Sequence, residues 1–386
     1  MNRHPRLDFL DYLRAFIILL VIVMHTALAY IPNWPDWVHN PQTNGWFAVI
    51  AIFAESGVLM PIVFFISGYF TLSSLARHGA VDFLKNKAVR LGLPFLVGVF
   101  MVGPTLHALS YYSDGGTLPF AQTVSLWFSR GYIGQYHFWY LNVLLVFLVL
   151  TVLAAKRFPG LLKAKPCHHL PPTGLLFGAI FALNAAVCFA VNLVIPYTTW
   201  AILGLLQFQP VKVPLYVSYF CLGIYAWKND WFKEEGYRPH LSPWIFIYLV
   251  SFLFILLLGL KTSLEPTTIT QKLLANTAAS AEVLSALMTC LALFQKLGRL
   301  DHPWLKRVSR LSFNAYLVHL SIAFAILYLA RDVALPLLAK YVLHASGAVI
   351  LSWGLAYGMS QLPGLLKGLS RQQPQAKKEL RTNLTA

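Results

Sequence analysis

The chain has 386 residues, of which 58% are hydrophobic and only 11% are charged. An ordinary soluble protein has about 45–50% apolar and about 25% charged residues, so the composition excludes a cytosolic enzyme, a disordered regulator and a disulfide-stapled scaffold. The mean hydropathy of +0.62 predicts an all-α integral membrane protein. The net charge of +16 is explained by Lys and Arg in cytoplasmic loops, and we predict no nucleic-acid partner.

The predicted membrane spans are ten apolar runs, since a span needs about 20 mostly apolar residues. They are expected to be helices, because they lack the alternation of barrel strands and every backbone group in lipid must be bonded internally. The stretch 196–210 is a candidate re-entrant segment. The ten runs are roughly 12–31, 46–72, 91–110, 138–155, 174–195, 213–227 (a short run), 243–260, 273–295, 311–330 and 341–361.

The distribution of Lys and Arg between these runs predicts the topology. Alternate connecting segments carry 24 and 6 of the 30 basic residues. Because basic residues favour the cytoplasmic side, we predict a ten-helix membrane bundle with both termini cytoplasmic. Residues 1–361 form the predicted membrane domain, and residues 362–386 form a basic cytoplasmic tail that we expect to be disordered.

No metal site is predicted. Cys167, His168 and His169 are adjacent, but no further ligand stands near them at a metal-binding spacing. No two cysteines share a C-x-x-C spacing.

Arg14 and His25 are the first ionisable residues inside a predicted span, where placing such a side chain in lipid costs free energy. They are 11 residues apart, which places them on one helix face about 16 Å apart. An arginine suits phosphate through its planar donor fork, and a neutral histidine suits general-base work near neutral pH. The alternatives are a topology anchor for Arg14 and a structural hydrogen bond between helices for His25.

Glu55, Tyr316 and His319 are further candidates inside the predicted spans. Glu55 lies in the span that follows His25, so it can orient the imidazole as a carboxylate does in a catalytic triad. The alternative, that Glu55 is solvated near the interface, has equal weight. His319 follows Tyr316 by three residues and therefore lies on nearly the same helix face.

Five motifs, taken in order, resemble the acyltransferase-3 family of membrane proteins. The resemblance extends from residue 8 to about residue 320 and includes the predicted ten-helix layout. The motifs are Asp11-Tyr12-Leu13-Arg14 followed by His25, Phe64-Phe65-Ile66-Ser67-Gly68-Tyr69-Phe70, Lys87-Ala88-Val89-Arg90 with Leu91 and Pro94, His137-Phe138-Trp139-Tyr140-Leu141, and Ser312 with Tyr316-Leu317-Val318-His319.

Within the family, the chain is most similar to the stand-alone branch that succinylates periplasmic glucans. It departs from that branch at Met60-Pro61, where a basic residue is expected. The identity of the acyl group, acetyl or succinyl, is therefore left open.

The resemblance implies acyl transfer from a CoA thioester to a sugar hydroxyl, with acyl-CoA as a substrate and no permanently bound cofactor. It implies that Arg14, Lys87 and Arg90 bind the CoA phosphates and that His25 is the general base. Glu55 would orient His25. A donor among Ser67, Tyr316 and His319 would stabilise the oxyanion, with Ser67 also placed in the CoA site. The residues expected to bind the carbohydrate acceptor are His137, Trp139 and Trp46; for each tryptophan the alternative is an interfacial belt.

Three rival functions compete with this interpretation. A proton-coupled transporter also buries His and Glu, but no duplicated half repeats the Arg14 and His25 pattern. A membrane scaffold has no need for these two residues to share a face. The third rival is an acyltransferase that acts on a lipid or an amino sugar. The oligomeric state is left open.

Overall fold

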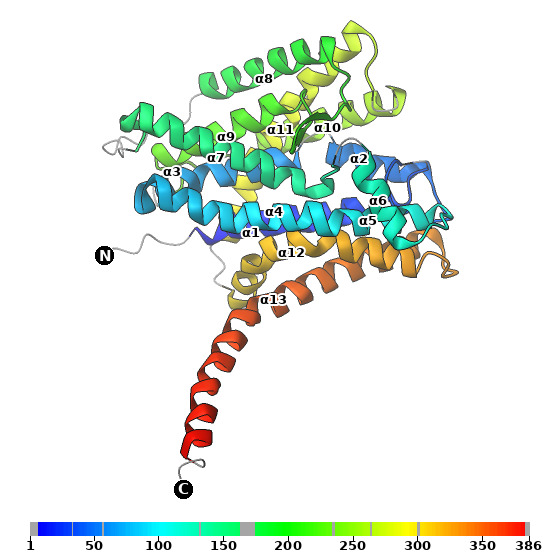
Figure 1. The fold of residues 1–386 in the computed structure, drawn as a ribbon. Helices are drawn as coiled ribbons and strands as arrows, with labels where there is room; N and C mark the ends of the chain where they lie inside the picture. Colours follow the sequence, from blue (N-terminus) through cyan, green and yellow to red (C-terminus); the bar gives the residue numbers. More distant parts are fainter. Residues whose placement is uncertain are drawn as a thin grey trace.

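The computed structural model describes residues 7–32, 34–55, 58–130, 133–162, 174–233, 236–262, 265–298 and 302–382, without the side chains of residues 51, 54, 55 and 362–382. The described chain is mostly helical (Figure 1). Its α-helices are α1 (Asp8–Leu28), α2 (Ala48–Glu55), α3 (Leu59–Lys87), α4 (Leu93–Val97), α5 (Gly103–Ser113), α6 (Phe120–Ser129), α7 (Trp139–Arg157), α8 (Gly174–Val194), α9 (Val213–Lys228), α10 (Leu241–Thr262), α11 (Ile269–Leu297), α12 (Pro303–Leu329) and α13 (Leu337–Thr382). Three short 3-10 turns (Gly45–Phe47, Tyr136–Phe138 and Pro159–Leu161) and two π-helical turns (Ala88–Gly92 and Gly98–Val102) join them.

Eight helical segments of the described chain are long and apolar enough to cross a membrane, so the protein is an all-α, multi-pass membrane protein. One segment, Leu59–Ser113, is 55 residues long and includes the predicted run 91–110. It bends at Gly79, whose φ of 73° lies in the left-handed region that glycine adopts without steric cost. α9 has 16 residues, fewer than the ~20 of a typical span. The count of ten spans and the cytoplasmic termini stay predictions.

The prediction of one continuous helix over 46–72 is wrong. α2 ends at Glu55, and α3 begins at Leu59. Apolar residues stand on both sides of this interruption, so hydropathy alone does not detect it. The tail predicted at 362–386 lies outside the side chains that the structure describes.

The candidate re-entrant stretch 196–210 contains an antiparallel hairpin. Its strands are β1 (Ala201–Leu203) and β2 (Leu206–Phe208), with Leu203 opposite Leu206. Strands this short leave no alternating pattern in the sequence. The hairpin is anchored from outside, because the Asn142 side chain donates to the carbonyl of Leu205.

α1 lies in the middle of the stacked helices, with α12 on one side and α3, α7 and α9 on the other (Figure 1). It packs against α12, α13, α11, α2 and α3. By contrast, α8 and α10 expose many apolar side chains, as lipid-facing helices do. The central position of α1 explains why its polar residues meet partners from several helices.

α3 and α9 approach each other more closely than side chains would normally allow. A Cβ atom added at Gly223 would lie 2.1 Å from the carbonyl oxygen of Phe65, and one added at Gly68 would lie 2.0 Å from that of Phe220. Small residues at such crossings let two membrane helices pack backbone to backbone. This contact fixes the wall of α3 that carries Ser67.

Candidate active site

Arg14 and His25 both point from α1 towards α12, so the shared helix face expected from their spacing is present in the structure. The guanidinium Nε of Arg14 donates to Ser312 Oγ at 3.2 Å. Nδ1 of His25 lies 2.9 Å from Nε2 of His319. Arg14 and His25 mark the two ends of a stripe along one face of α1, called here the α1 stripe. Ser312 and His319 are two turns apart on α12, and therefore α12 provides one partner for each end of this stripe.

The hydrogen bonds around His319 fix which nitrogens carry protons. Nδ1 of His319 lies 2.7 Å from the carbonyl oxygen of Tyr316. A carbonyl only accepts, so this nitrogen is the donor. In a neutral His319, Nε2 is then an acceptor and Nδ1 of His25 must donate to it. The remaining nitrogen of His25, Nε2, keeps its lone pair and can accept a proton.

His319 contacts the His25 ring, and its own contacts and those of Tyr316 bear on the oxyanion role expected of them. Glu55 ends α2, and its side chain lies outside those described, so its expected role stays a prediction. His319 has both nitrogens engaged and is not available as an oxyanion donor. The Tyr316 hydroxyl is also engaged, because it donates to the carbonyl of His137.

His137 completes a cluster of three buried histidines. Its ring lies 4.6 Å from that of His319, nearly edge-on, and 5.3 Å from that of Tyr316. The side chain is 4% exposed, and neither ring nitrogen has a hydrogen-bond partner of ordinary geometry. A buried polar group without such a partner is costly, which marks His137 as a candidate for contact with a bound substrate.

Trp37 holds the other side of His25. Its indole Nε1 donates to the backbone carbonyl of His25 at 3.1 Å, and the two rings lie 5.5 Å apart. A single tryptophan in a loop gives no signal that it reaches back to the preceding helix.

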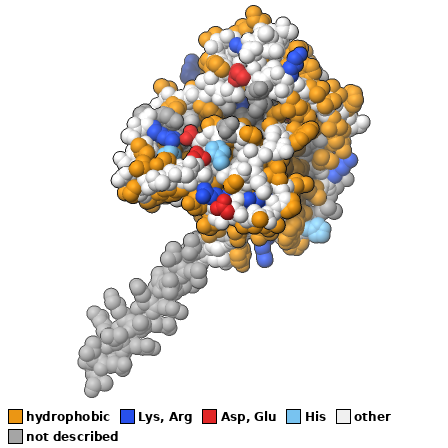
Figure 2. Space-filling model, turned by 90° about the vertical axis from the view of Figure 1, so that its right-hand side faces the viewer, with side chains coloured by type: hydrophobic (Ala, Val, Ile, Leu, Met, Phe, Trp, Pro, Cys, Tyr) orange, Lys and Arg blue, Asp and Glu red, His pale blue; other side chains and the backbone are white. Residues whose placement is uncertain are grey.

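The end of the bundle at which α1 finishes is closed by loops. Polar contacts join them: His39 Nδ1 lies 2.7 Å from Asp114 Oδ1, and Arg130 Nη2 forms an ion pair with Asp36 Oδ1 at 3.3 Å. Figure 2 views this end and shows charged and histidine side chains across its middle, with others near the edges among hydrophobic side chains. Between this polar end and the histidine pair, the residues that follow on α1 and α12, among them Leu28, Phe324 and Leu327, belong to a separate buried apolar cluster.

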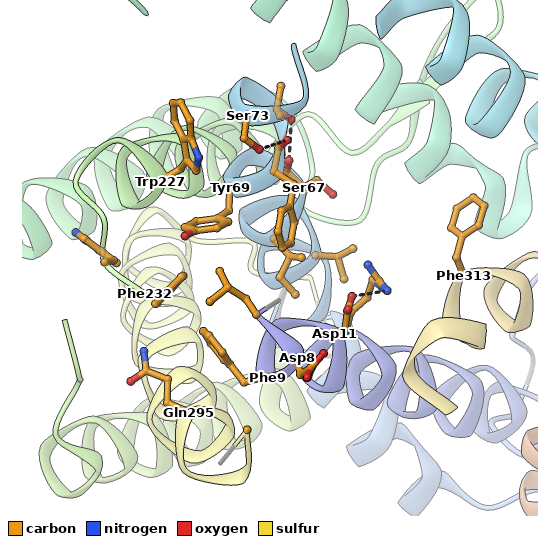
Figure 3. A pocket seen from close by; sticks show the side chains of 18 of the residues that line it. Asp8, Phe9, Asp11, Ser67, Tyr69, Ser73, Trp227, Phe232, Gln295 and Phe313 are labelled. Atoms are coloured by element: carbon orange, nitrogen blue, oxygen red, sulfur yellow. Dashed lines mark hydrogen bonds and ion pairs between the residues drawn. The ribbon is translucent and has the colours of Figure 1, made fainter. Parts of the chain in front are cut away.

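A cavity of about 1820 Å³ opens at the opposite end of α1. Figure 3 shows residues of α1, α3, α9, α11 and α12 around it, among them Asp11, Ser67, Trp227, Gln295 and Phe313. Five of the residues predicted as catalytic or CoA-binding line this one cavity: Arg14, Ser67, Lys87, Arg90 and Tyr316.

The cavity follows the α1 stripe towards His25. Asp11, Arg14, Ile18 and Val21 line it, and their spacing of three or four residues places them on one helix face. His25 is the next residue of this stripe, one turn beyond Val21. Neither His25 nor His319 is among the lining residues, whereas Tyr316, one turn before His319, is. The cavity thus ends one helical turn short of the histidine pair.

The mouth of the cavity is rich in cations. Seven Lys and Arg line it against three Asp among the described residues. Asp11 pairs with Arg14 at 2.8 Å, and the Arg90 guanidinium lies 5.6 Å from the ring of Phe313. Tyr237 also lines the mouth, and burial raises the pKa of its hydroxyl, so it adds no negative charge. An excess of cations with aromatic neighbours is suited to a phosphorylated ligand.

Four of the seven cations were not singled out from the sequence. They come from separate helices and loops, and only the fold brings them together: Arg77, Lys233, Arg238 and Lys296. The available signal was that all four belong to segments counted on the predicted cytoplasmic side.

The remaining predicted residues are dispersed. Trp139 packs against Trp200 and Tyr216, at ring distances of 5.5 Å each. Trp46 is 78% exposed on a 3-10 turn. Ser67 Oγ lies 2.9 Å from the hydroxyl of Tyr140, a residue to which we had assigned no role.

Within the described part of the chain, no three His, Cys, Asp or Glu residues gather as metal ligands do. The Cys167, His168 and His169 segment lies outside the described residues.

The fold and this site define a class: a multi-pass membrane protein with a buried histidine pair above a cation-lined cavity. A family profile described as an acyltransferase domain matches residues 7–357. The chain therefore belongs to the acyltransferase-3 family.

Curated relatives agree with this assignment. The chain is 25% identical over 239 residues to glucans biosynthesis protein C of Salmonella gallinarum, an alignment that covers 61% of this chain and 62% of the relative. It is 26% identical over 242 residues to the protein of the same name from Salmonella heidelberg, with the same coverage. The alignments thus span less than two thirds of the curated relatives they match.

Proposed function

We propose that this protein is an O-acyltransferase of the bacterial inner membrane that moves an acyl group from cytoplasmic acyl-CoA to a hydroxyl of a periplasmic glucan or another envelope carbohydrate. The observation that carries the proposal is the His25 and His319 pair, with a basic nitrogen left on His25 one turn beyond a cation-lined cavity. The membership of the acyltransferase-3 family and the glucan-related name of the relatives support it.

The donor binds from the mouth of the cavity. The phosphates of CoA meet Arg14, Lys87 and Arg90, which line the same space and offer charge-assisted hydrogen bonds. The pantetheine arm follows the α1 stripe past Ile18 and Val21, over the ~16 Å that separates Arg14 from His25.

The transfer step uses His25 as the base. Nε2 of His25 takes the proton of the acceptor hydroxyl, whose oxygen attacks the thioester carbonyl. The carbon–sulfur bond then breaks, and the proton passes to the thiolate of CoA. His319 supports the imidazolium that forms, because its Nε2 accepts from Nδ1 of His25.

The oxyanion is stabilised by the Ser67 and Tyr140 hydroxyls. These two groups share one hydrogen bond, so one O–H of the pair remains to donate to the developing charge. Both residues line the cavity. Of the three residues expected to bind the acceptor, His137 lies within the histidine cluster. Trp139 and Trp46 lie outside that cluster.

Mass spectrometry of envelope and periplasmic glycans tests this proposal. Cells with and without the gene should differ by a defined acyl group on a carbohydrate hydroxyl, and a His25→Ala variant should match the deletion. His240→Ala, an exposed histidine outside the site, serves as the matched control and should match wild type. Identical glycans in deletion and wild type would refute the carbohydrate acceptor, and a mass difference confined to lipid would transfer the proposal to a lipid acceptor.

A further inference from the structure

The inner end of the cavity differs from its mouth in one property that bears on the acyl group. Beyond Arg14, the α1 stripe continues with Ile18 and Val21, and α3 contributes Met60 and Val63. Ile18, Val21 and Val63 are each at most 5% exposed. The lining at this depth is therefore aliphatic, and its surfaces are buried.

The depth of Met60 follows from the helix directions. Arg77 and Lys87, near the end of α3, line the mouth together with Asp8 and Asp11 at the start of α1. Met60 stands at the beginning of α3 and lies 17 residues before Arg77, which is about 25 Å along a helix. Met60 is consequently at the histidine end of the cavity.

No described Lys or Arg of the lining reaches this end, because Arg14 is the deepest cation and is held by Ser312 and Asp11. The segment 54–57, whose side chains are not described, has the sequence Ala-Glu-Ser-Gly and contributes no cation. The first turn of α3 has a partly positive end, but Pro61 removes one of its amide donors. The polar groups nearby include the hydroxyls of Ser67 and Tyr140, which are uncharged, and the Tyr316 hydroxyl, which already donates to the carbonyl of His137.

From these observations we propose that Met60, with Val21 and Val63, forms the acyl-binding end of the cavity and selects short, uncharged acyl groups such as acetyl over dicarboxylic ones such as succinyl. The inference rests on the proposed function. A succinyl group would place its free carboxylate two methylenes beyond the thioester carbonyl, among aliphatic side chains. An unpaired carboxylate in such surroundings is strongly disfavoured, whereas a methyl group is favoured there.

The side chain of Met60 also sets the length of acyl chain that fits. It is unbranched and partly buried, so it fills the end of the cavity without completing a rigid wall. Removing it leaves room for one or two further methylenes. A cation in its place would supply the partner that a terminal carboxylate lacks.

Competition binding with the purified full-length protein in detergent tests the inference. CoA, acetyl-CoA, propionyl-CoA, butyryl-CoA and succinyl-CoA each compete against labelled CoA, with rates of acyl transfer measured once the acceptor is known. We expect acetyl-CoA to bind at least about tenfold more tightly than succinyl-CoA, and transfer from it to be at least ~100-fold more efficient. Equal or tighter binding of succinyl-CoA would overturn the inference.

Two variants keep the test sharp. Met60→Arg should reverse much of the preference by raising affinity for succinyl-CoA relative to acetyl-CoA. Met60→Ala should raise the affinity for butyryl-CoA relative to acetyl-CoA. Met101→Ala, at a methionine that is 68% exposed and outside the cavity lining, is the control and should leave both affinity ratios unchanged. If Met60→Arg does not fold, the Met60→Ala ratios decide; unchanged ratios in Met60→Ala refute the role of Met60.

The outcomes separate this inference from the proposed function. If neither CoA nor any acyl-CoA binds, the donor site itself is wrong. If CoA binds and succinyl-CoA is preferred, the donor site stands and only the acyl selectivity is wrong.

Discussion

The two ends of the α1 stripe use the same helix face for opposite purposes. At Arg14 the face opens into a wide cavity lined by seven cations, and the side chain is 27% exposed. At His25 the face is covered by Trp37 and α12, and the polar partner is a neutral ring 2.9 Å away. In the proposed mechanism, the binding of a charged donor and the transfer of a proton are therefore separated by two apolar residues, Ile18 and Val21, along one helix.

The separation has a physical reason. Charges at the mouth stay near water, where they cost little and can attract an anionic ligand. In the proposed mechanism the base at the inner end has to stay neutral to accept a proton, and the hydrogen bonds of the described side chains set its tautomer. Substitutions at the two ends should therefore affect different kinetic constants.

The largest effect is expected for His25→Ala. Without the base, kcat should fall by about 10²–10⁴-fold, while the KM for acyl-CoA stays close to wild type because Arg14 and the mouth are intact. Steady-state kinetics with the purified protein measure both constants, with His240→Ala as the control. Retention of wild-type kcat would remove His25 from the chemistry.

His319→Ala should have the second-largest effect. It removes the acceptor that holds Nδ1 of His25, and loss of one buried hydrogen bond worth about 1–3 kcal/mol corresponds to roughly a tenfold to hundredfold lower kcat.

The pH profile separates orientation from simple destabilisation in this variant. Because an imidazolium has no lone pair, wild-type activity should fall as the pH is lowered, and His319→Ala should shift that fall. His319→Gln retains an amide oxygen that can accept from His25 and should restore part of the rate. A profile that matches wild type would limit His319 to packing.

Arg14→Ala should act on the other end. Loss of charge-assisted hydrogen bonds worth about 1.5–3 kcal/mol should raise the KM for acyl-CoA roughly tenfold or more, with kcat nearly unchanged. Arg14→Lys should recover only part of the affinity, because an ammonium lacks the planar donor fork. Arg157→Ala, an exposed arginine at the end of α7, is the control. An unchanged KM would place the donor phosphates elsewhere.

Gly223→Ala should have the smallest effect on the activity of each folded molecule. The added Cβ meets the backbone of Phe65 and Tyr69 at 2.1 and 2.8 Å, and such overpacking typically costs about 1–3 kcal/mol. Thermal unfolding in detergent should show a lower midpoint. Gly178→Ala, where nothing lies within 4 Å, should not destabilise the protein, and equal midpoints for the two variants would contradict the close α3–α9 packing.

Several features followed from the sequence because their causes are local. Apolar runs of span length predict membrane helices wherever they occur, and 8 segments of the described chain fit that expectation. The Arg14 and His25 stripe follows from the 3.6-residue period of a helix and needs no knowledge of the fold. The interruption between α2 and α3 and the hairpin at 201–208 do not change hydropathy, so they were missed.

The site was only partly predictable for a related reason. Ser67, Lys87, Arg90 and Tyr316 stand in motifs that the family resemblance marked, and they do share one cavity with Arg14. Which of them are free to act depends on hydrogen bonds that the sequence does not specify. The Tyr316 hydroxyl donates to the carbonyl of His137, and Nδ1 of His319 donates to the carbonyl of Tyr316. This leaves the hydroxyls of Ser67 and Tyr140 as the available donor pair.

The sequence by itself determined that the chain is a membrane protein and that a guanidinium and an imidazole lie on one face of its first helix, since both follow from composition and helical period. Only the tertiary structure decided that His319, 294 residues away, is a partner of His25. Such a pairing depends on α1 packing against α12, and contacts between distant segments leave no periodic trace in the chain.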